Sequence, residues 1–262
     1  MKLDLFQIDS FTDTVFKGNP ACVVPLDNWL NDDILLNIAK ENAVAETAFF
    51  IDKGDKFHLR WFTPEIEMDL CGHATLAAAH CLKSILNYKR DEIIFETLSG
   101  ELIITFENDY YSMDLPSRMP IRSELPKVIS QALNIIPKEV FKSRDYLLVY
   151  ENQDEIKDIV VNKQIFDKIN LGHGGVIVTS EGKKCDFVSR FFTSQASILE
   201  DPVTGSSHCS LTPFWAKRLN KESLHANQIS KRGGSLKCLN KARRVIVSGK
   251  AKTYSIGTLW TE

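Results

Sequence analysis

The sequence lacks the features that mark several large classes of protein. Its six cysteines form no Cys-x-x-Cys pair and no repeated spacing, which argues against a disulfide framework and favours reduced thiols. No hydrophobic run approaches the roughly 20 residues of a membrane span. Asp4 and Asp9 interrupt the apolar start, where a signal peptide needs an unbroken core. We therefore expect a cytoplasmic protein with no membrane partner.

An excess of one charge sign is also missing. The 32 basic and 34 acidic side chains leave a net charge of −2, so no general attraction to nucleic acid is predicted. No segment has low complexity, and the hydrophobic fraction of 44% is ordinary for a globular chain. With 262 residues the chain can bury a core as one large domain or two smaller ones. Because these features favour neither a membrane nor a nucleic acid as partner, we expect a small-molecule substrate.

One stretch has the character of a binding site: Glu200-Asp201-Pro202-Val203-Thr204-Gly205-Ser206-Ser207-His208. An acid pair is followed by a proline turn, a glycine and small hydroxyl residues that precede an expected helix over 210–219. The first amides of a helix have no partner within it and attract anions. The stretch therefore predicts a carboxylate, Asp201, beside free backbone N–H groups at Gly205 and Ser206.

A second stretch repeats this order of elements. Arg60-Trp61-Phe62-Thr63 leads to Asp69, to Cys71-Gly72-His73-Ala74 and to an expected helix over 75–86, as Arg190-Phe191-Phe192-Thr193 leads to Asp201, Gly205 and the later helix. Alanines on several faces of the first helix predict that it is buried and enclosed by a sheet. The repetition indicates two related halves.

The hydrophobic pattern supplies the remaining elements and a boundary near the prolines and charges of residues 117–126. We predict a first half, 1–116, and a second half, 117–262, whose last strand pairs back into the first half. The first half contains strands over 3–9, 21–25, 57–62, 93–95, 102–106 and 110–115 and a helix over 32–42. The second contains a helix over 127–133, a mainly helical stretch over 154–169, and strands over 146–150, 176–179, 187–193, 236–239, 245–247 and 254–259, with a further short strand at Ile229.

Four motifs, in this order along the chain, resemble the phenazine biosynthesis PhzF-like family. They are Asp9-Ser10-Phe11-Thr12 with Gly18-Asn19-Pro20, Ala45-Glu46-Thr47-Ala48-Phe49, Cys71-Gly72-His73-Ala74-Thr75, and Glu200-Asp201-Pro202-Val203-Thr204-Gly205-Ser206. The similar tail, Arg232-Gly233-Gly234, extends the resemblance over the whole chain. Ser197, where the family usually has glycine, and Ser207, where alanine is common, depart from its pattern and suggest a different substrate.

The resemblance implies the diaminopimelate-epimerase-like fold, an α+β architecture. It has two pseudo-symmetric halves, each a curved and mostly antiparallel sheet around a central helix, with the active site in the cleft between them. The family's PhzF member isomerises trans-2,3-dihydro-3-hydroxyanthranilate by moving a proton, without cofactor or metal. The resemblance also implies a homodimer.

The resemblance and the residue chemistry together assign roles at the site. Glu46, His73 and Asp201 are the expected catalytic residues, and Gly72, Ala74, Gly205 and Ser206 the expected substrate-binding residues. Glu46 lies in an apolar segment, where loss of hydration favours proton exchange near neutral pH. Each residue also has a purely structural interpretation. Glu46 would be a glutamate at a strand edge, His73 a helix-start residue and Asp201 a turn residue.

Three other functions stay open on the sequence. Cys71, His73, His208 and Cys209 are the candidates for a zinc site, although their spacing is unlike that of a standard finger. An amino-acid racemase or epimerase would need a thiol from each half, and the second turn offers Asp201 and Thr204 instead. The third is a non-catalytic member that binds a small ligand or a protein. The favoured hypothesis is a cofactor-independent isomerase that moves a proton on a small cyclic or unsaturated carboxylic acid.

Overall fold

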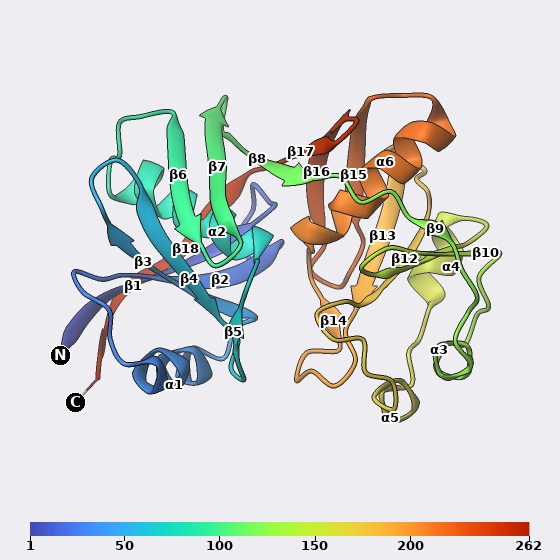
Figure 1. The fold of residues 1–262 in the computed structure, drawn as a ribbon, viewed down its shortest axis with the longest axis horizontal. Coiled ribbons are helices and arrows are strands. Elements are labelled where there is room, and N and C mark those ends of the chain that lie inside the picture. Colours follow the sequence, from blue (N-terminus) through green and yellow to red (C-terminus); the bar gives the residue numbers. More distant parts are fainter. Residues whose placement is uncertain (262) are drawn as a thin grey trace. The chain divides into compact units, whose positions relative to one another are not determined.

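A computed structural model describes residues 1–261 of the chain, which form two compact units (Figure 1). Unit 1 comprises Met1–Asp114 together with the chain from Ser248 onward, and unit 2 comprises Leu115–Val247. The chain passes from one unit to the other within strand β8 (Tyr110–Pro116) and again within strand β17 (Arg244–Gly249). Among the described residues, no helix combines the length and apolar character that a membrane crossing requires.

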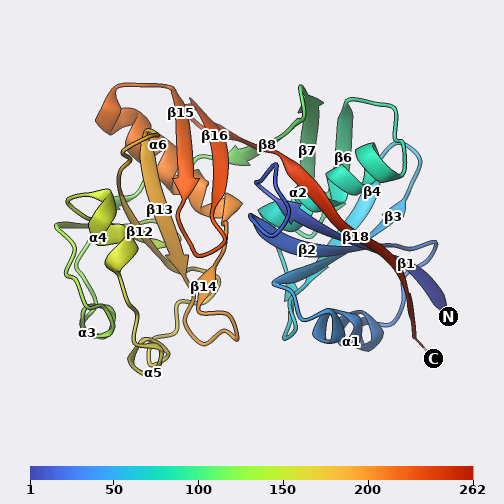
Figure 2. The same cartoon turned by 180° about the vertical axis from the view of Figure 1, so that it is seen from behind.

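Unit 1 is a mostly antiparallel sheet with two parallel contacts. Strand β1 lies between β18 and β2, and the sheet continues through β3, β4, β6, β7 and β8. The β2–β3 and β4–β6 pairs are parallel. Figure 2 shows β18 beside β1 along its length. The strands other than β8 are β1 (Lys2–Ser10), β2 (Asn19–Pro25), β3 (Glu46–Asp52), β4 (Phe57–Phe62), β5 (Glu67–Met68), β6 (Glu92–Thr97), β7 (Gly100–Glu107) and β18 (Ala251–Trp260).

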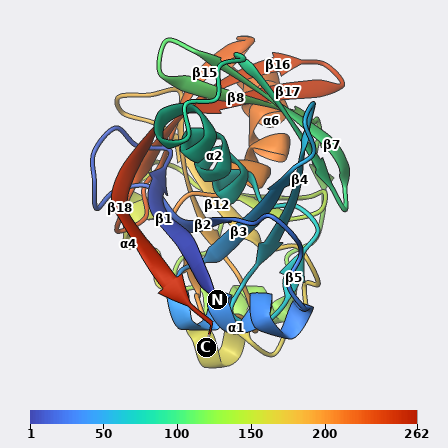
Figure 3. The same ribbon diagram turned by 90° about the vertical axis from the view of Figure 1, so that its left-hand side faces the viewer.

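Helix α2 (Gly72–His80) is the centre of unit 1. All nine of its residues are buried, as expected for a helix that is small and apolar on every side. It packs against β1, β2, β3 and β18, which curve around it (Figure 3). Helix α1 (Asp32–Asn42) buries only one face, through Leu35, Ile38 and Ala39. The sheet therefore encloses α2 and leaves α1 at the surface.

Unit 2 repeats this ladder with its own strands. Antiparallel pairs β9–β10 and β10–β11 lead to a parallel β11–β12 pair, an antiparallel β12–β13 pair, a parallel β13–β15 pair and an antiparallel β15–β16 pair. The strands other than β17 are β9 (Ile121–Arg122), β10 (Glu139–Lys142), β11 (Tyr146–Val149), β12 (Val176–Glu181), β13 (Phe187–Phe192), β14 (Glu200–Asp201), β15 (Ser223–Gln228) and β16 (Gly234–Lys241). The helices are α3 (Lys127–Ala132), α4 (Gln153–Asp158), α5 (Lys163–Phe166), the short 3₁₀ helix η2 (Gly205–Ser207) and α6 (His208–Leu219).

The repeat extends to individual side chains. Arg60 donates to Glu67 through Nε and Nη2, both at 2.7 Å, and its guanidinium lies over the Phe62 ring. Arg190 donates to Glu200 in the same way, at 2.7 and 2.9 Å, and lies over Phe192. In both units this Arg–Glu pair fixes the short strand, β5 or β14, that leads toward the buried helix.

Helix α6 is also buried, although Pro213 lies inside it. Proline has no N–H, so the carbonyl four residues earlier, that of Cys209, loses its helical partner. The backbone N–H of Arg118 donates to that carbonyl at 2.8 Å. The proline therefore ties the segment after β8 to the helix without leaving a buried acceptor unpaired.

Several elements differ from the sequence predictions. The α2 helix begins at Gly72, before residue 75, and ends in a five-residue π-helix (Cys81–Ile85). The predicted helical stretch over 154–169 is two short helices, because extended residues around Ile159 and Val161 separate them. Strand β10 was missed, and strand β15 lies over Ser223–Gln228, just before the strand expected at Ile229, because polar and small residues weaken both patterns.

Candidate functional site

Three chemically active side chains meet at the start of α2. Glu46, the first residue of β3, places its Oε2 atom 3.1 Å from Nε2 of His73, and Nδ1 of His73 lies 3.6 Å from Sγ of Cys71. The His73 and Glu46 side chains are only 4% and 16% exposed. The imidazole is thus held between a carboxylate and a thiol with little water.

The contact between Glu46 and His73 has the distance of an ion pair but not the alignment of a hydrogen bond. Within residues 1–261 neither Oε2 of Glu46 nor Nε2 of His73 has an aligned hydrogen-bond partner. Buried polar atoms in folded proteins nearly always have one. Two such atoms together are available to exchange a proton with a bound molecule.

Two opposing effects set the pKa of His73. Burial favours the neutral imidazole and lowers the pKa, whereas the Cys71 sulfur and the Glu46 carboxylate favour the imidazolium and raise it. The net pKa lies well above the ordinary value of 6.5. This shift favours the imidazolium form of His73, whose Nε2 atom faces the Glu46 carboxylate.

The Cys71 side chain lies at the same place, and His73 opposes the effects that raise its pKa. Burial first, and the negative charge of Glu46 second, raise the pKa of this thiol. Glu46, Cys71 and His73 place one potential metal-ligand atom each within 4.8 Å of one another. Zinc binds the thiolate, so a zinc ion at this place would displace the Cys71 proton.

The motifs around this cluster fix its backbone. The buried Ser10 hydroxyl donates to the His73 carbonyl at 2.8 Å, and Thr75 Oγ1 donates to the Cys71 carbonyl at 2.5 Å. Gly18 has φ +65°, and a Cβ atom there would lie 2.1 Å from the Ser10 carbonyl oxygen. Only glycine fits, which explains why Ser10 and Gly18 occur in one motif.

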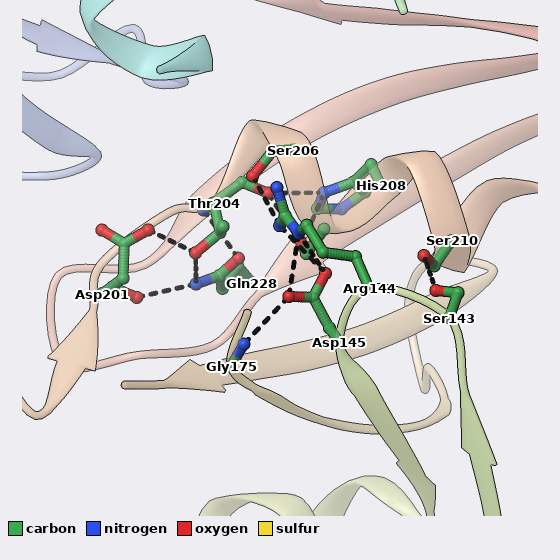
Figure 4. Close-up of polar contacts among 11 residues, drawn as sticks. Ser143, Arg144, Asp145, Gly175, Asp201, Thr204, Ser206, His208, Ser210 and Gln228 are labelled. Atoms are coloured by element: carbon green, nitrogen blue, oxygen red, sulfur yellow. Dashed lines mark hydrogen bonds and ion pairs between the residues drawn. The ribbon is translucent and has the colours of Figure 1, made fainter. Parts of the chain in front are cut away.

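In unit 2 hydrogen bonds among Asp201, Thr204 and Gln228 hold the Asp201 turn (Figure 4). Thr204 Oγ1 donates to the Asp201 carboxylate. The buried Gln228 donates through Nε2 to the Asp201 carbonyl at 2.7 Å and accepts from the Thr204 N–H at 2.9 Å. Gln228, which was not among the predicted site residues, therefore holds the acid turn against β15.

Ser206 lies beyond this turn and is contacted by a charged pair. Arg144 donates from Nη2 to Ser206 Oγ at 3.1 Å and from Nε and Nη2 to the buried Asp145. His208 directs Nδ1 at the Thr204 carbonyl, 2.9 Å away. Burial lowers the pKa of His208 to about 4, against a smaller opposite effect of that carbonyl.

Unit 1 contains four of the predicted site residues, Glu46, Gly72, His73 and Ala74, and unit 2 contains Asp201, Gly205 and Ser206. Of the predicted set, Glu46 and His73 bring their reactive atoms into contact with each other. Ser10, Gln228, Arg144 and Asp145 were missed as supports. Among the departures from the family pattern, Ser207 donates to the Thr204 carbonyl at 2.8 Å, and Ser197 is exposed in the loop before β14.

The sheets, the buried helices and the two turns define an α+β protein of duplicated architecture. A hydroxyproline epimerase from Agrobacterium vitis shares this fold, with a TM-score of 0.60 over 98% of this chain and 92% of its own, at 11% identity. A PhzF-family phenazine biosynthesis protein from Enterococcus faecalis is much closer, with a TM-score of 0.95 and 41% identity over 99% of this chain and all of its own. The predicted fold class is confirmed.

The chain belongs to the phenazine biosynthesis-like (PhzC-PhzF) family, whose model matches residues 8–257. A Pseudomonas aeruginosa protein named as an uncharacterised isomerase is 45% identical over 260 residues, which cover 99% of each chain. The predictions of family and of isomerase class are confirmed, and an enzyme of this family acts on a small molecule.

Proposed function

We propose that the chain is a cofactor-independent isomerase in which Glu46 moves a proton between two carbons of a small cyclic or unsaturated carboxylic acid. The observation that carries this proposal is the 3.1 Å approach of Glu46 to His73 in a nearly dry site, without an aligned partner for either atom. A carboxylate held this close to an imidazole can act as a general base toward a bound molecule. Once protonated, Glu46 can return the proton to a second carbon.

His73 has a supporting role in this scheme. Its raised pKa keeps a positive charge beside Glu46 in the resting enzyme and opposes the negative charge that develops on the substrate. The amides of Gly72, His73 and Ala74 precede the first backbone hydrogen bond of α2, and the Cys71 sulfur interacts with the Ala74 amide. The N–H groups of Gly72, His73 and Ala74 are therefore candidates to bind a substrate oxygen.

We assign substrate binding also to the second turn. Thr204 fixes the carboxylate of Asp201, and Arg144 fixes the hydroxyl of Ser206, next to Gly205. Such fixed polar groups recognise the hydroxyl, amino or carboxyl groups of a small acid. The cytoplasm and a homodimer are the compartment and assembly that we propose from the family resemblance.

The main alternative, a racemase with two thiols, is disfavoured by the repeat. In unit 1 Phe62 pairs with Glu67, and in unit 2 Phe192 pairs with Glu200. These two strand pairs align the repeats. Along the chain from there, Cys71 before Gly72 corresponds to Thr204 before Gly205. A hydroxyl occupies the place where the second thiol would lie, and it is too weak an acid to replace a thiolate.

The test is proton NMR in D₂O with trans-2,3-dihydro-3-hydroxyanthranilate and a panel of related hydroxy and amino acids. We expect isomerisation or deuterium uptake that falls by a factor of about 10² to 10⁴ in Glu46→Gln, the range for general acid–base groups. Glu41→Gln, at an exposed position on α1, is the matched control and should keep full activity. A fully active Glu46→Gln enzyme would reject Glu46 as the base.

Two further outcomes separate the alternatives. Deuterium exchange at the α-carbon of amino acids, with loss of optical activity, would favour the racemase. Binding of panel acids without any exchange would favour a non-catalytic ligand-binding protein. Metal analysis of protein purified without chelator completes the test, because stoichiometric zinc would contradict the cofactor-independent proposal.

A further inference from the structure

Asp145 is a buried carboxylate that the proposed reaction does not use. It is 1% exposed and lies in the turn between β10 and β11. Its Oδ1 accepts from the Gly175 N–H at 2.9 Å and from Arg144 Nε at 3.1 Å, and its Oδ2 accepts from Arg144 Nη2 at 2.9 Å. Burial of an ion pair costs several kcal/mol of desolvation per ion, so such a pair is weak evidence of a purely stabilising role.

The orientation of Arg144 shows where this carboxylate acts. Held on one edge by Asp145, the guanidinium donates from Nη2 to Ser206 Oγ at 3.1 Å (Figure 4). An N–H always donates, so the Ser206 oxygen is the acceptor in this bond and its own proton is directed elsewhere. The Arg144 side chain keeps 24% of its surface exposed.

The surroundings of Ser206 favour an anion. Ser206 is within η2, directly before the first turn of α6, where backbone N–H groups carry partial positive charge. Burial raises the pKa of the Cys209 thiol in that turn, and the positive charges of Arg118 and Arg144 act in the opposite direction. Two guanidinium groups therefore influence the start of this helix, and Asp145 is the acid that opposes them there.

We propose that Asp145 and Arg144 are positioning residues that turn Ser206 into a dedicated hydrogen-bond donor for the carboxylate of the substrate. Asp145 fixes the guanidinium, the guanidinium occupies a lone pair of the Ser206 oxygen, and the Ser206 proton is left for the ligand. A serine that is not oriented in this way can also accept from the N–H groups of an amide, whereas an oriented donor binds most strongly to the charged oxygen of a carboxylate. This proposal rests on the proposed function, which supplies the acidic substrate.

Binding of a simple carboxylate tests the relay without any turnover. The probes are benzoate and its neutral counterpart benzamide, titrated into the full chain while the backbone amide signals of residues 205–208 are followed by NMR. We expect Ser206→Ala and Arg144→Met each to weaken benzoate about tenfold, as for loss of a hydrogen bond to a charged group, with little change for benzamide. Arg144→Lys, which keeps the charge but loses the fork, should recover only part of the affinity.

A double-mutant cycle distinguishes positioning from simple structural damage. If Arg144 acts through Ser206, Arg144→Met should have no further effect in the Ser206→Ala background, because the hydroxyl it orients is gone. Asp145→Asn should resemble Arg144→Met, and thermal unfolding verifies that the variant is folded. Arg122→Met, which removes an exposed charge in the same unit, is the matched control and should leave benzoate affinity unchanged.

Several outcomes would overturn the relay. These are full additivity in the cycle, equal losses for benzoate and benzamide, or no benzoate-dependent shift at residues 205–208 of the unmodified protein. Failure of the isomerase proposal has a different signature, namely the absence of deuterium exchange with every acid. Benzoate binding that depends on Arg144 would then still support the relay.

Discussion

The two turns that precede α2 and α6 have the same scaffold and opposite chemistry. Each follows an Arg–Glu pair of nearly identical geometry on paired strands. When the two turns are aligned on these strand pairs, Met68 corresponds to Asp201, Cys71 to Thr204 and His73 to Ser206. The residues that hold the turn have therefore been kept in both units, whereas the residues that offer protons or charge have not.

Two of the three buried histidines, His73 and His208, show how far the environments at the two helix starts differ. The pKa of His73 is raised, because the effects of Cys71 and Glu46 exceed that of burial, whereas the pKa of His208 is lowered to about 4, because burial dominates and only the Thr204 carbonyl opposes it. The duplicated fold thus places histidines with oppositely shifted pKa values at the starts of its two buried helices, α2 and α6. The neighbouring Cys71 sulfur and Glu46 carboxylate make the difference.

Replacement of the acid in one turn, and of its counterpart in the other, should give the largest contrast in activity. We expect Asp201→Asn to lower kcat/KM by roughly 10²-fold or more, because the substrate loses a carboxyl group that holds it or exchanges a proton with it. Met68→Leu, at the corresponding position, should change kcat/KM less than about twofold, since its shape and polarity are nearly kept. Steady-state kinetics on the substrate found in D₂O would measure both.

Equal losses in Met68→Leu and Asp201→Asn would break the comparison, because they would show that both positions act only through the shape of the turn. Thermal unfolding of each variant is the control. A loss of activity without a change in unfolding temperature assigns the effect to the carboxylate.

The repeat and the buried helix were predictable from the sequence because local signals carried them. The Ala-rich stretch over 74–79 and the aromatic starts at residues 60–63 and 190–193 are visible in the sequence. The supports were not predictable, because they come from distant residues. Gln228 meets Asp201 across 27 positions and Arg144 meets Ser206 across 62, and neither has a local pattern that indicates its partner.

Acid titration should separate the two histidines in stability. The folded pKa of His208, about 4, lies below its ordinary value of 6.5, so its contribution is complete above pH 6.5 and is lost as pH falls toward 4. The loss amounts to about 3 kcal/mol for a shift of this size. His208→Gln should therefore flatten the fall in unfolding free energy between pH 6.5 and 4, as measured by urea unfolding.

The sign is reversed for His73. Its folded pKa lies above 6.5, so its contribution is complete below pH 6.5 and is lost as pH rises through the raised value. His73→Gln should remove the fall in unfolding free energy at alkaline pH and leave the fall between pH 6.5 and 4 unchanged. If His73→Gln instead removed the acidic fall in unfolding free energy and His208→Gln the alkaline one, the role of Glu46 in setting the charge of His73 would be contradicted.

The Arg–Glu pairs should have unequal effects despite their matching geometry. Arg190 donates not only to Glu200 but also, through Nη1, to the carbonyls of Ile156 and Ile159 at 3.0 and 2.8 Å. Arg60 has instead an exposed second partner, Asp32, whose side chain is 72% exposed. Truncation of either arginine leaves its glutamate unpaired. Truncation at Arg190 also leaves the partly buried carbonyls of Ile156 and Ile159 unpaired, whereas truncation at Arg60 also leaves the solvated Asp32 carboxylate unpaired.

We therefore expect Arg190→Met to lower the unfolding free energy by about 2–3 kcal/mol and Arg60→Met by about 1 kcal/mol, with Arg122→Met near zero, in urea unfolding at neutral pH. Arg190→Met should also reduce turnover, because Glu200 is adjacent to Asp201, whereas Glu67 is adjacent only to Met68. Equal costs at residues 60 and 190 would mean that the α4 carbonyls gain nothing from the guanidinium. In that case the shared Arg–Glu pair alone would account for the stability of both turns, and the asymmetry between the units would be confined to their chemistry.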